Sequence, residues 1–342
     1  MRRFFTEFLK RKSKILLYYS KYCLAFILIT SLLSSCKSSP PLDSKNGQDA
    51  KLKVIASLFP QYDVAKQLLE DKADVSFLLP LGVESHNFDP SAADIAKICQ
   101  SDLFLYTGKY MEPWADRVVS ANESSKLKVV DVSSGIELKK EEHDHEEHEE
   151  EEEDDDEEHE HHEHNDHTFD PHVWLDPNLV MTMAKNIASA ACEKSPENKE
   201  FFEQNLAKYE QELKKLDEDF QKLVASSKRH CLVFGGRSAH QYFTLRYGLE
   251  CISAIHGCLE ESEPSVKDIS KIIKFVKENK IPVIFHEEPE PTKLVQSIAE
   301  QTGASIKRFS AIHNVTASEW ESGVTYIGEM RKNLENLELG LN

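Results

Sequence analysis

Histidine is the residue type in this sequence with the clearest capacity for chemistry. The 342 residues contain 15 histidines, and eight of them fall between Glu141 and His167. Neutral imidazole is a good ligand for zinc, copper and nickel, and carboxylates attract any divalent cation. This composition predicts metal binding, and the position of each histidine indicates which ones form a defined site.

The segment 141–167 combines its eight histidines with 18 acidic residues and has neither Lys nor Arg. It contains nothing apolar to bury, so we expect a disordered loop. A merely solvated loop would explain the acids but not the imidazoles, and we therefore favour metal capture. Because a flexible loop cannot impose one geometry, sites within it should be weak, multiple and poorly selective.

The other seven histidines are His86, His172, His230, His240, His256, His286 and His313. A lone histidine is usually structural, so each needs support from its position. His86 and His313 each follow a predicted strand, and His172 follows the insert and precedes a helix. Open α/β sheets bind ligands at the carboxyl ends of their strands. We therefore expect these three imidazoles to converge, and we interpret His230 and His286 as structural.

Short apolar runs and amphipathic stretches alternate in two separate regions of the chain. We predict strands at 54–59, 75–79, 103–106, 129–132, 231–234, 251–255, 282–285 and 306–309. We predict helices at 62–69, 92–99, 114–119, 238–247, 266–279, 292–302 and 318–337. This alternation indicates an α/β protein with two lobes, each built on a mostly parallel sheet.

One long helix should join the lobes over residues 196–228. Apolar residues recur there at intervals of four and three, at Phe202, Leu206, Tyr209, Leu213, Leu216, Phe220 and Leu223. Such a stripe could mark a coiled-coil dimer, but docking along both lobes of a monomer suits four heptads better. The expected lobes are residues 52–195 and 229–342.

The amino terminus resembles a bacterial lipoprotein signal. Residues 1–35 carry seven basic groups and one acid, with an apolar run over 22–33 that is too short to span a bilayer. Small residues precede Cys36, the expected lipidation site, and 36–51 has the composition of a flexible tether. We expect a lipid-anchored protein outside the cytoplasmic membrane, periplasmic or at the cell surface. A short uncleaved anchor is the alternative.

Net charge, cysteine content and the absence of a catalytic motif limit the classes of function and the disulfide bonds that the chain can have. The net charge of −19 disfavours nucleic-acid binding through a basic surface. Five cysteines remain beyond Cys36, an odd number, and whether Cys251 and Cys258 pair is left open. A metallohydrolase is disfavoured because the sequence has no His-Glu-x-x-His motif.

Two motifs resemble those of the metal-binding solute-binding proteins of bacterial ABC importers, specifically the group that binds zinc or manganese. The first runs from Gly82 through His86 to Ser91, followed by Met111-Glu112-Pro113-Trp114. The second is Asp170-Pro171-His172-Val173-Trp174-Leu175-Asp176-Pro177, preceded by the acidic histidine insert. The resemblance covers nearly all of the chain beyond the signal, and it implies a single divalent metal held between two lobes and delivered to a membrane permease.

The resemblance is incomplete at two ligand positions. The family's fourth ligand, in many members an Asp after the last strand, corresponds to His313 by region only. The family's third ligand falls on Arg237, which cannot bind a cation, so His240 or Glu287 is expected to complete the shell with His86, His172 and His313. A mainly imidazole set favours Zn²⁺ over Mn²⁺. The expected function is zinc delivery to an ABC importer without catalysis. A manganese importer component and a surface adhesin or metal buffer are the alternatives.

Overall fold

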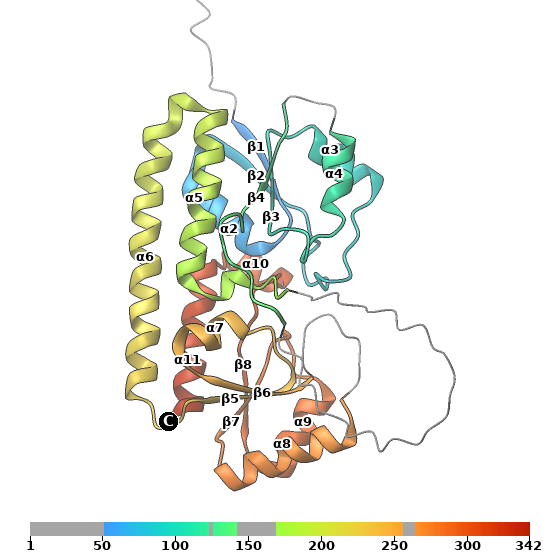
Figure 1. Ribbon diagram of the computed structural model, residues 1–342, viewed down its shortest axis with the longest axis vertical. Helices are drawn as coiled ribbons and strands as arrows, with labels where there is room; N and C mark the ends of the chain where they lie inside the picture. The colour runs from blue at the N-terminus through green and yellow to red at the C-terminus, as the bar shows by residue number, and fades with distance from the viewer. Residues whose placement is uncertain (1–50, 123–125, 142–168, 256–263) are drawn as a thin grey trace, which may run out of the picture. The chain divides into compact units, whose positions relative to one another are not determined.

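The computed structural model describes residues 51–122, 126–141, 169–255 and 264–342 (Figure 1). The expectations for the signal, Cys36, the tether, nearly all of the insert, His256 and Cys258 lie outside these residues. Residues Lys51–Asn342 form one unit. Within it, the predicted α/β class and the two parallel sheets are confirmed.

The first sheet has four parallel strands in the order β2-β1-β3-β4. Its strands are β1 (Leu52–Ala56), β2 (Ala73–Phe77), β3 (Leu103–Tyr106) and β4 (Lys128–Asp131). Alternate residues face opposite sides: Val54 and Leu105 belong to the largest apolar cluster, whereas Ile55 and Phe104 belong to a smaller one. Helices therefore cover both faces, as continuous apolar strands require.

The helices around this sheet divide between its faces. Helices α2 (Phe59–Leu69) and α5 (Pro177–Lys194) pack on the face of the large cluster, and α3 (Ala92–Cys99) and α4 (Ala115–Ala121) on the other. Strand β1 is shorter than the predicted 54–59, because Pro60 in the first turn favours a helix that begins at Phe59.

The second sheet repeats the same order, β6-β5-β7-β8, again with parallel pairs. Its strands are β5 (Cys231–Arg237), β6 (Glu250–Ile255), β7 (Val283–His286) and β8 (Ser305–Arg308). Helices α8 (Val266–Asn279) and α9 (Lys293–Thr302) cover one face, and α7 (Gln241–Tyr247) lies by the other (Figure 1). In both sheets the strand order reverses beside the first strand, because the next two strands in sequence lie on opposite sides of it. Open α/β sheets bind ligands at such a reversal, beyond the carboxyl ends of the strands.

The predicted long helix is α6 (Lys199–Ser226), preceded by a 3₁₀ turn at Pro196–Asn198. The predicted docking on both lobes is confirmed. Asn205 Nδ2 donates to Leu68 O at 3.1 Å in the first lobe, and Asp217 accepts from Arg246 and Tyr247 of α7 in the second. The apolar stripe is therefore covered by the chain's own lobes.

The prediction of one helix over 318–337 is wrong. The structure has α10 (Ala317–Glu321) and α11 (Tyr326–Leu341) instead. Gly323, with φ of +73°, allows the left-handed turn that separates them, and Thr325 caps α11 by accepting from Gly328 N. Asp63 of α2 accepts from Tyr326 N at 2.9 Å, so α11 begins against the first lobe and then runs along the second sheet.

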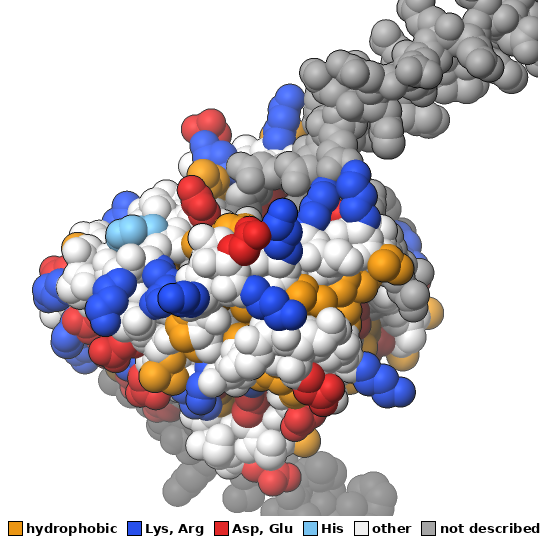
Figure 2. Space-filling model, turned by 90° about the horizontal axis from the view of Figure 1, so that it is seen from below, with side chains coloured by type: hydrophobic (Ala, Val, Ile, Leu, Met, Phe, Trp, Pro, Cys, Tyr) orange, Lys and Arg blue, Asp and Glu red, His pale blue; other side chains and the backbone are white. Residues whose placement is uncertain are grey.

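Figure 2 shows the molecule from the end at which α8 and α9 lie in Figure 1. Basic side chains are spread over this face among acidic and apolar ones, so its described surface carries both signs of charge. In the described residues, no helix is both long and apolar enough to cross a membrane.

Glu112 is a buried carboxyl group that joins two loops of the first sheet. It accepts from Ser57 Oγ, after β1, and from Thr107 N at 3.0 Å, after β3. Burial raises the pKa of Glu112 to about 8, against the lowering effect of these two hydrogen bonds. The carboxyl group is therefore largely protonated at pH 7, while it is ionised in the unfolded chain.

We predict that Glu112→Gln changes the pH dependence of stability. Because the folded pKa lies above the unfolded one, the stability that Glu112 contributes is lost as pH rises towards 8. Between pH 6 and pH 8 the wild type should lose about 2–3 kcal/mol of its free energy of unfolding relative to the variant. Denaturant unfolding across this range measures the difference, and parallel curves would contradict the assignment.

Candidate metal centre

Three predicted histidines meet where loops from both lobes converge. His86 lies between β2 and α3, His172 precedes a 3₁₀ turn (Val173–Leu175) and α5, and His313 lies between β8 and α10. Each offers one ring nitrogen, and these nitrogens all lie within 4.8 Å of one another. Among the described residues this is the group of donor atoms that could hold a metal ion.

The spacing within this three-histidine cluster suits a single small cation. The Nε2 atoms of His86 and His172 are 3.2 Å apart. Two nitrogens bound tetrahedrally to zinc at about 2.0–2.1 Å would stand about 3.3–3.4 Å apart. His313 Nε2 is buried and has no hydrogen-bond partner in the described structure. A cation would satisfy a nitrogen of this kind.

Asp170 orients the central ligand. His172 Nδ1 lies 2.6 Å from Asp170 Oδ1, and the backbone N–H of His172 donates to the same oxygen at 2.8 Å. A proton on Nδ1 leaves the Nε2 lone pair directed at the cluster, the arrangement that metal-binding histidines commonly have. Burial raises the pKa of Asp170 to about 7.

Electrostatics keep the three imidazoles neutral. Burial lowers the pKa of His172 and His313 well below the usual value and also lowers that of His86. Repulsion between the rings lowers the pKa of His172 and His313 further. A neutral imidazole has a lone pair for a metal, so protons compete little for this site at neutral pH.

The loop that carries His313 is fixed to the first lobe. Phe59 N donates to His313 O at 3.1 Å, and Trp174 Nε1 donates to Ala311 O at 2.8 Å. Ile312 has a φ of +59°, which β-branched residues rarely adopt. The surrounding contacts therefore impose the backbone conformation from which the His313 side chain projects.

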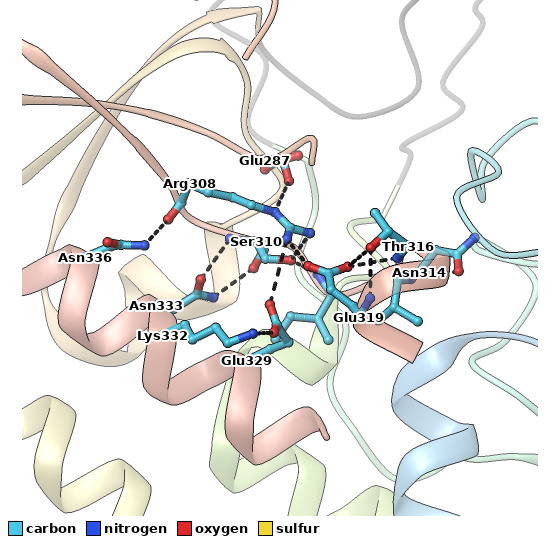
Figure 3. A network of polar contacts seen from close by, with 12 residues as sticks. Glu287, Arg308, Ser310, Asn314, Thr316, Glu319, Glu329, Lys332, Asn333 and Asn336 are labelled. Carbon is cyan, nitrogen blue, oxygen red and sulfur yellow. Dashed lines mark hydrogen bonds and ion pairs between the residues drawn. The ribbon is translucent and has the colours of Figure 1, made fainter. Parts of the chain in front are cut away.

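A polar network supports this loop from the second lobe (Figure 3). Asn333 of α11 accepts from Ser310 N and donates to Ser310 O, both at 2.8 Å. Arg308 pairs with Glu319 of α10, and its carbonyl accepts from Asn336 at 2.8 Å. The network ties the end of β8 to α10 and α11 three residues before His313.

His240 and Glu287 interact with each other instead of joining the cluster. His240 Nδ1 lies 2.9 Å from Glu287 Oε1, and Ala239 N donates to the same oxygen. The His240 ring stacks on Phe234, with 4.9 Å between centroids. Neither residue belongs to the group within 4.8 Å, so a ligand role for either remains a prediction.

Arg237 lies beside the cluster at the end of β5. It is half-buried and lines a cavity of about 220 Å³ together with His86, His313 and Glu287. Its positive charge contributes to lowering the pKa of all three histidines of the cluster. The remaining described histidines, His230 and His286, lie outside the cluster.

Sequence reasoning assigned no role to Asp170 or Asn333. The order Asp170-Pro171-His172 does indicate this contact, because a carboxylate two residues before a histidine ligand can reach the second nitrogen of its ring. Asn333 lies 23 residues from its partner Ser310, on a helix whose docking the local pattern does not specify.

A family model described as "Zinc-uptake complex component A periplasmic" matches residues 54–340. The high-affinity zinc uptake system protein ZnuA of Bacillus subtilis is 32% identical over 308 residues, covering 90% of this chain and 93% of that protein. The zinc-binding lipoprotein AdcA of Streptococcus pneumoniae is 30% identical over 85% of this chain, which spans only 56% of the length of AdcA.

Solved structures agree with these sequence matches. The Zn(II)-bound ZnuA-like domain of Streptococcus pneumoniae AdcA has a TM-score of 0.69 and 27% identity, covering 85% of this chain and 99% of that one. The laminin-binding protein Lmb of Streptococcus agalactiae, described as bifunctional with adhesin and metal-transporting activity, has a TM-score of 0.70 and 27% identity, with 85% and 100% covered.

We predict that Asp170→Asn weakens zinc binding about 10- to 100-fold, because the amide no longer fixes the ring and tautomer of His172. Competition with a chelator of known zinc affinity measures the change. Asp89→Asn is the matched control, since Asp89 pairs with Arg117 in an exposed ion pair. Equal affinity in the two variants would show that Asp170 does not orient the ligand.

We predict that Asn333→Ala lowers the free energy of unfolding by about 2–4 kcal/mol, because two buried backbone groups of Ser310 lose their partner. Its zinc affinity should fall too, since the loop bearing His313 loosens. Asn336→Ala, which removes one bond to Arg308 O, should cost about 1 kcal/mol. Denaturant unfolding and zinc titration give both quantities, and identical values for the two variants would exclude this supporting role.

Proposed function

The chain belongs to the family of periplasmic component A proteins of zinc-uptake complexes, and from this premise we propose that it captures one zinc ion and delivers it to an ABC-type permease. One observation carries the proposal: three neutral imidazoles from separate loops place their nitrogens within 4.8 Å of one another. His86, His172 and His313 are the proposed ligands. Zinc is the cargo of this site and not a cofactor of a reaction.

The donor set supports zinc over manganese. Zinc is held tetrahedrally by nitrogen and sulfur ligands, whereas manganese prefers carboxylate, carbonyl and water oxygens. Among the described residues, Asp170 is a carboxylate bonded to a ring of the cluster, and it contacts Nδ1 of His172 instead of the space between the rings. The named relatives are zinc proteins as well. Manganese remains the alternative cargo.

The proposed location is the cell envelope, outside the cytoplasmic membrane. The small residues before Cys36, which resemble a lipoprotein signal, support a lipid anchor, and one relative is named as a lipoprotein. We propose residues 1–35 as the signal, 36–51 as the tether, and 52–195 and 229–342 as lobes joined by 196–228. The covered stripe on α6 supports a monomer.

The acidic histidine insert, residues 141–167, is proposed to concentrate zinc near the cluster through weak, multiple contacts. Lys140, which precedes the insert, and Phe169, two residues after it, form a β-bridge, so the chain enters and leaves the insert at neighbouring positions. Asp170 follows immediately. Zinc held by the insert would therefore be held close to His172.

Family membership makes the chain a substrate-binding protein of a transport system. We propose that it acts by binding alone, without catalysis. A surface adhesin is the second candidate function. The observation favouring it is the likeness to the laminin-binding protein of Streptococcus agalactiae, which combines both activities. The two functions can coexist on one chain.

Zinc titration of the full chain tests the proposal. We expect one tight zinc that survives deletion of residues 141–167 and is lost in the His86→Ala His172→Ala double variant. Replacing His230, an exposed histidine outside the cluster, with Ala is the matched control. Zinc bound only through the insert would contradict the proposal and would favour a surface metal buffer.

A further inference from the structure

Of the three proposed ligands, His86 is the one that follows an exposed stretch of chain. Residues 80–84, which lead to it, are all exposed. His172 is fully buried, and the carbonyl of His313 accepts a hydrogen bond from Phe59 N. The position of His86 therefore depends on what holds residues 80–86, which we call the His86 loop.

The His86 loop is joined to the segment that carries His313. Asn314 Nδ2 donates to Pro80 O at 2.7 Å and to Val83 O at 2.9 Å, across 231 to 234 residues of sequence. Gly82 N donates to Val315 O at 3.0 Å. Two of these three hydrogen bonds thus come from a single amide group. Carbonyl oxygens only accept, so the amide nitrogen of Asn314 must face them.

We propose that Asn314 is a positioning residue that keeps His86 at the metal and thereby slows the release of zinc. The proposal rests on the zinc-binding function proposed above. His313 precedes Asn314 in the chain, and His86 follows Val83 by three residues. Zinc bound by both histidines would connect the same two segments that Asn314 connects. The ion could then leave only when these connections open together.

The loop itself carries this restraint from Val83 to His86. Glu84 Oε1 accepts from the backbone N–H of His86 at 3.2 Å, so the residue after Val83 contacts the ligand directly. A site that is formed only part of the time binds its ligand more weakly in proportion to the fraction formed. Removing two hydrogen bonds of ordinary net strength should lower that fraction on the order of tenfold.

The rate of zinc release from the full chain tests the proposal. Loading with half an equivalent of zinc fills the tight site before the weak sites of the insert. Transfer of this zinc to an excess of chelator then measures dissociation. We expect Asn314→Ala to release zinc about tenfold faster than the wild type, with a similar loss of affinity. Asn314→Leu, which has a similar shape and no donor, should behave in the same way.

Asn186→Ala is the matched control. Asn186 is also half-buried, and its Nδ2 also donates to two loop carbonyls, Val132 O and Ser134 O, both at 2.9 Å. That loop carries none of the proposed ligands. The control should lose a similar amount of stability in denaturant and release zinc at the wild-type rate. Equal zinc release rates in Asn314→Ala and Asn186→Ala would overturn the proposal, whether both are fast or both are slow.

Amide hydrogen exchange gives a test that needs no variant. Zinc and the hydrogen bonds that close the same junction must stabilise each other. Zinc should therefore slow exchange at the Gly82 amide, relative to the Ile136 amide, which is bonded to Ser133 O elsewhere in the first lobe. In Asn314→Ala the Gly82 amide should exchange faster. A Gly82 amide that zinc leaves unaffected in the wild type would contradict the proposal.

Failure of the two proposals can be told apart. If the wild type binds one zinc tightly and Asn314→Ala releases it at the wild-type rate, the role of Asn314 is wrong and the zinc function stands. If the full chain and the His86→Ala His172→Ala double variant bind zinc equally, the zinc function itself is withdrawn, and the role of Asn314 is withdrawn with it.

Discussion

The structure depends on holding three uncharged imidazoles together in a buried space between loops of two sheets. Removing imidazolium from water is costly, so the rings stay neutral, and each neutral ring keeps one nitrogen with a lone pair that can bind a metal. Two hydrogen bonds to backbone carbonyls, from Phe59 N to His313 O and from Trp174 Nε1 to Ala311 O, hold the loops at the distance where the nitrogens converge. Without this convergence, each histidine would be an ordinary buried residue.

The rest of the fold serves this convergence. Both sheets have the same strand order, so each presents the carboxyl ends of its central strands to the shared space. Helices α6 and α11 contact elements of both lobes, and the largest apolar cluster is continuous from Leu105 to Phe285. Polar groups carry this rigidity to the cluster: Asp170 fixes the His172 ring, and Asn333 fixes the backbone before His313.

The sequence predicts much of this arrangement, because its signals are local. The 4-and-3 spacing of apolar residues predicts α6 to within a few residues, and strand ends identify His86 and His313. Local signals also fail in specific ways. The helical periodicity of the carboxyl-terminal segment predicts one continuous helix, but Gly323 and Thr325 separate it into α10 and α11. The environment of Arg237 and the pairing of His240 with Glu287 depend on tertiary packing, which spacing alone does not report.

The central claim is that zinc is bound by three imidazoles from His86, His172 and His313 and by one further light donor. X-ray absorption at the zinc edge, on the zinc-loaded full chain lacking residues 141–167, measures this shell directly. The account predicts three imidazole nitrogens at about 2.0–2.1 Å and one further nitrogen or oxygen at about 2.0–2.2 Å. A shell with fewer than three imidazoles, or one unchanged by replacing His172, would contradict it.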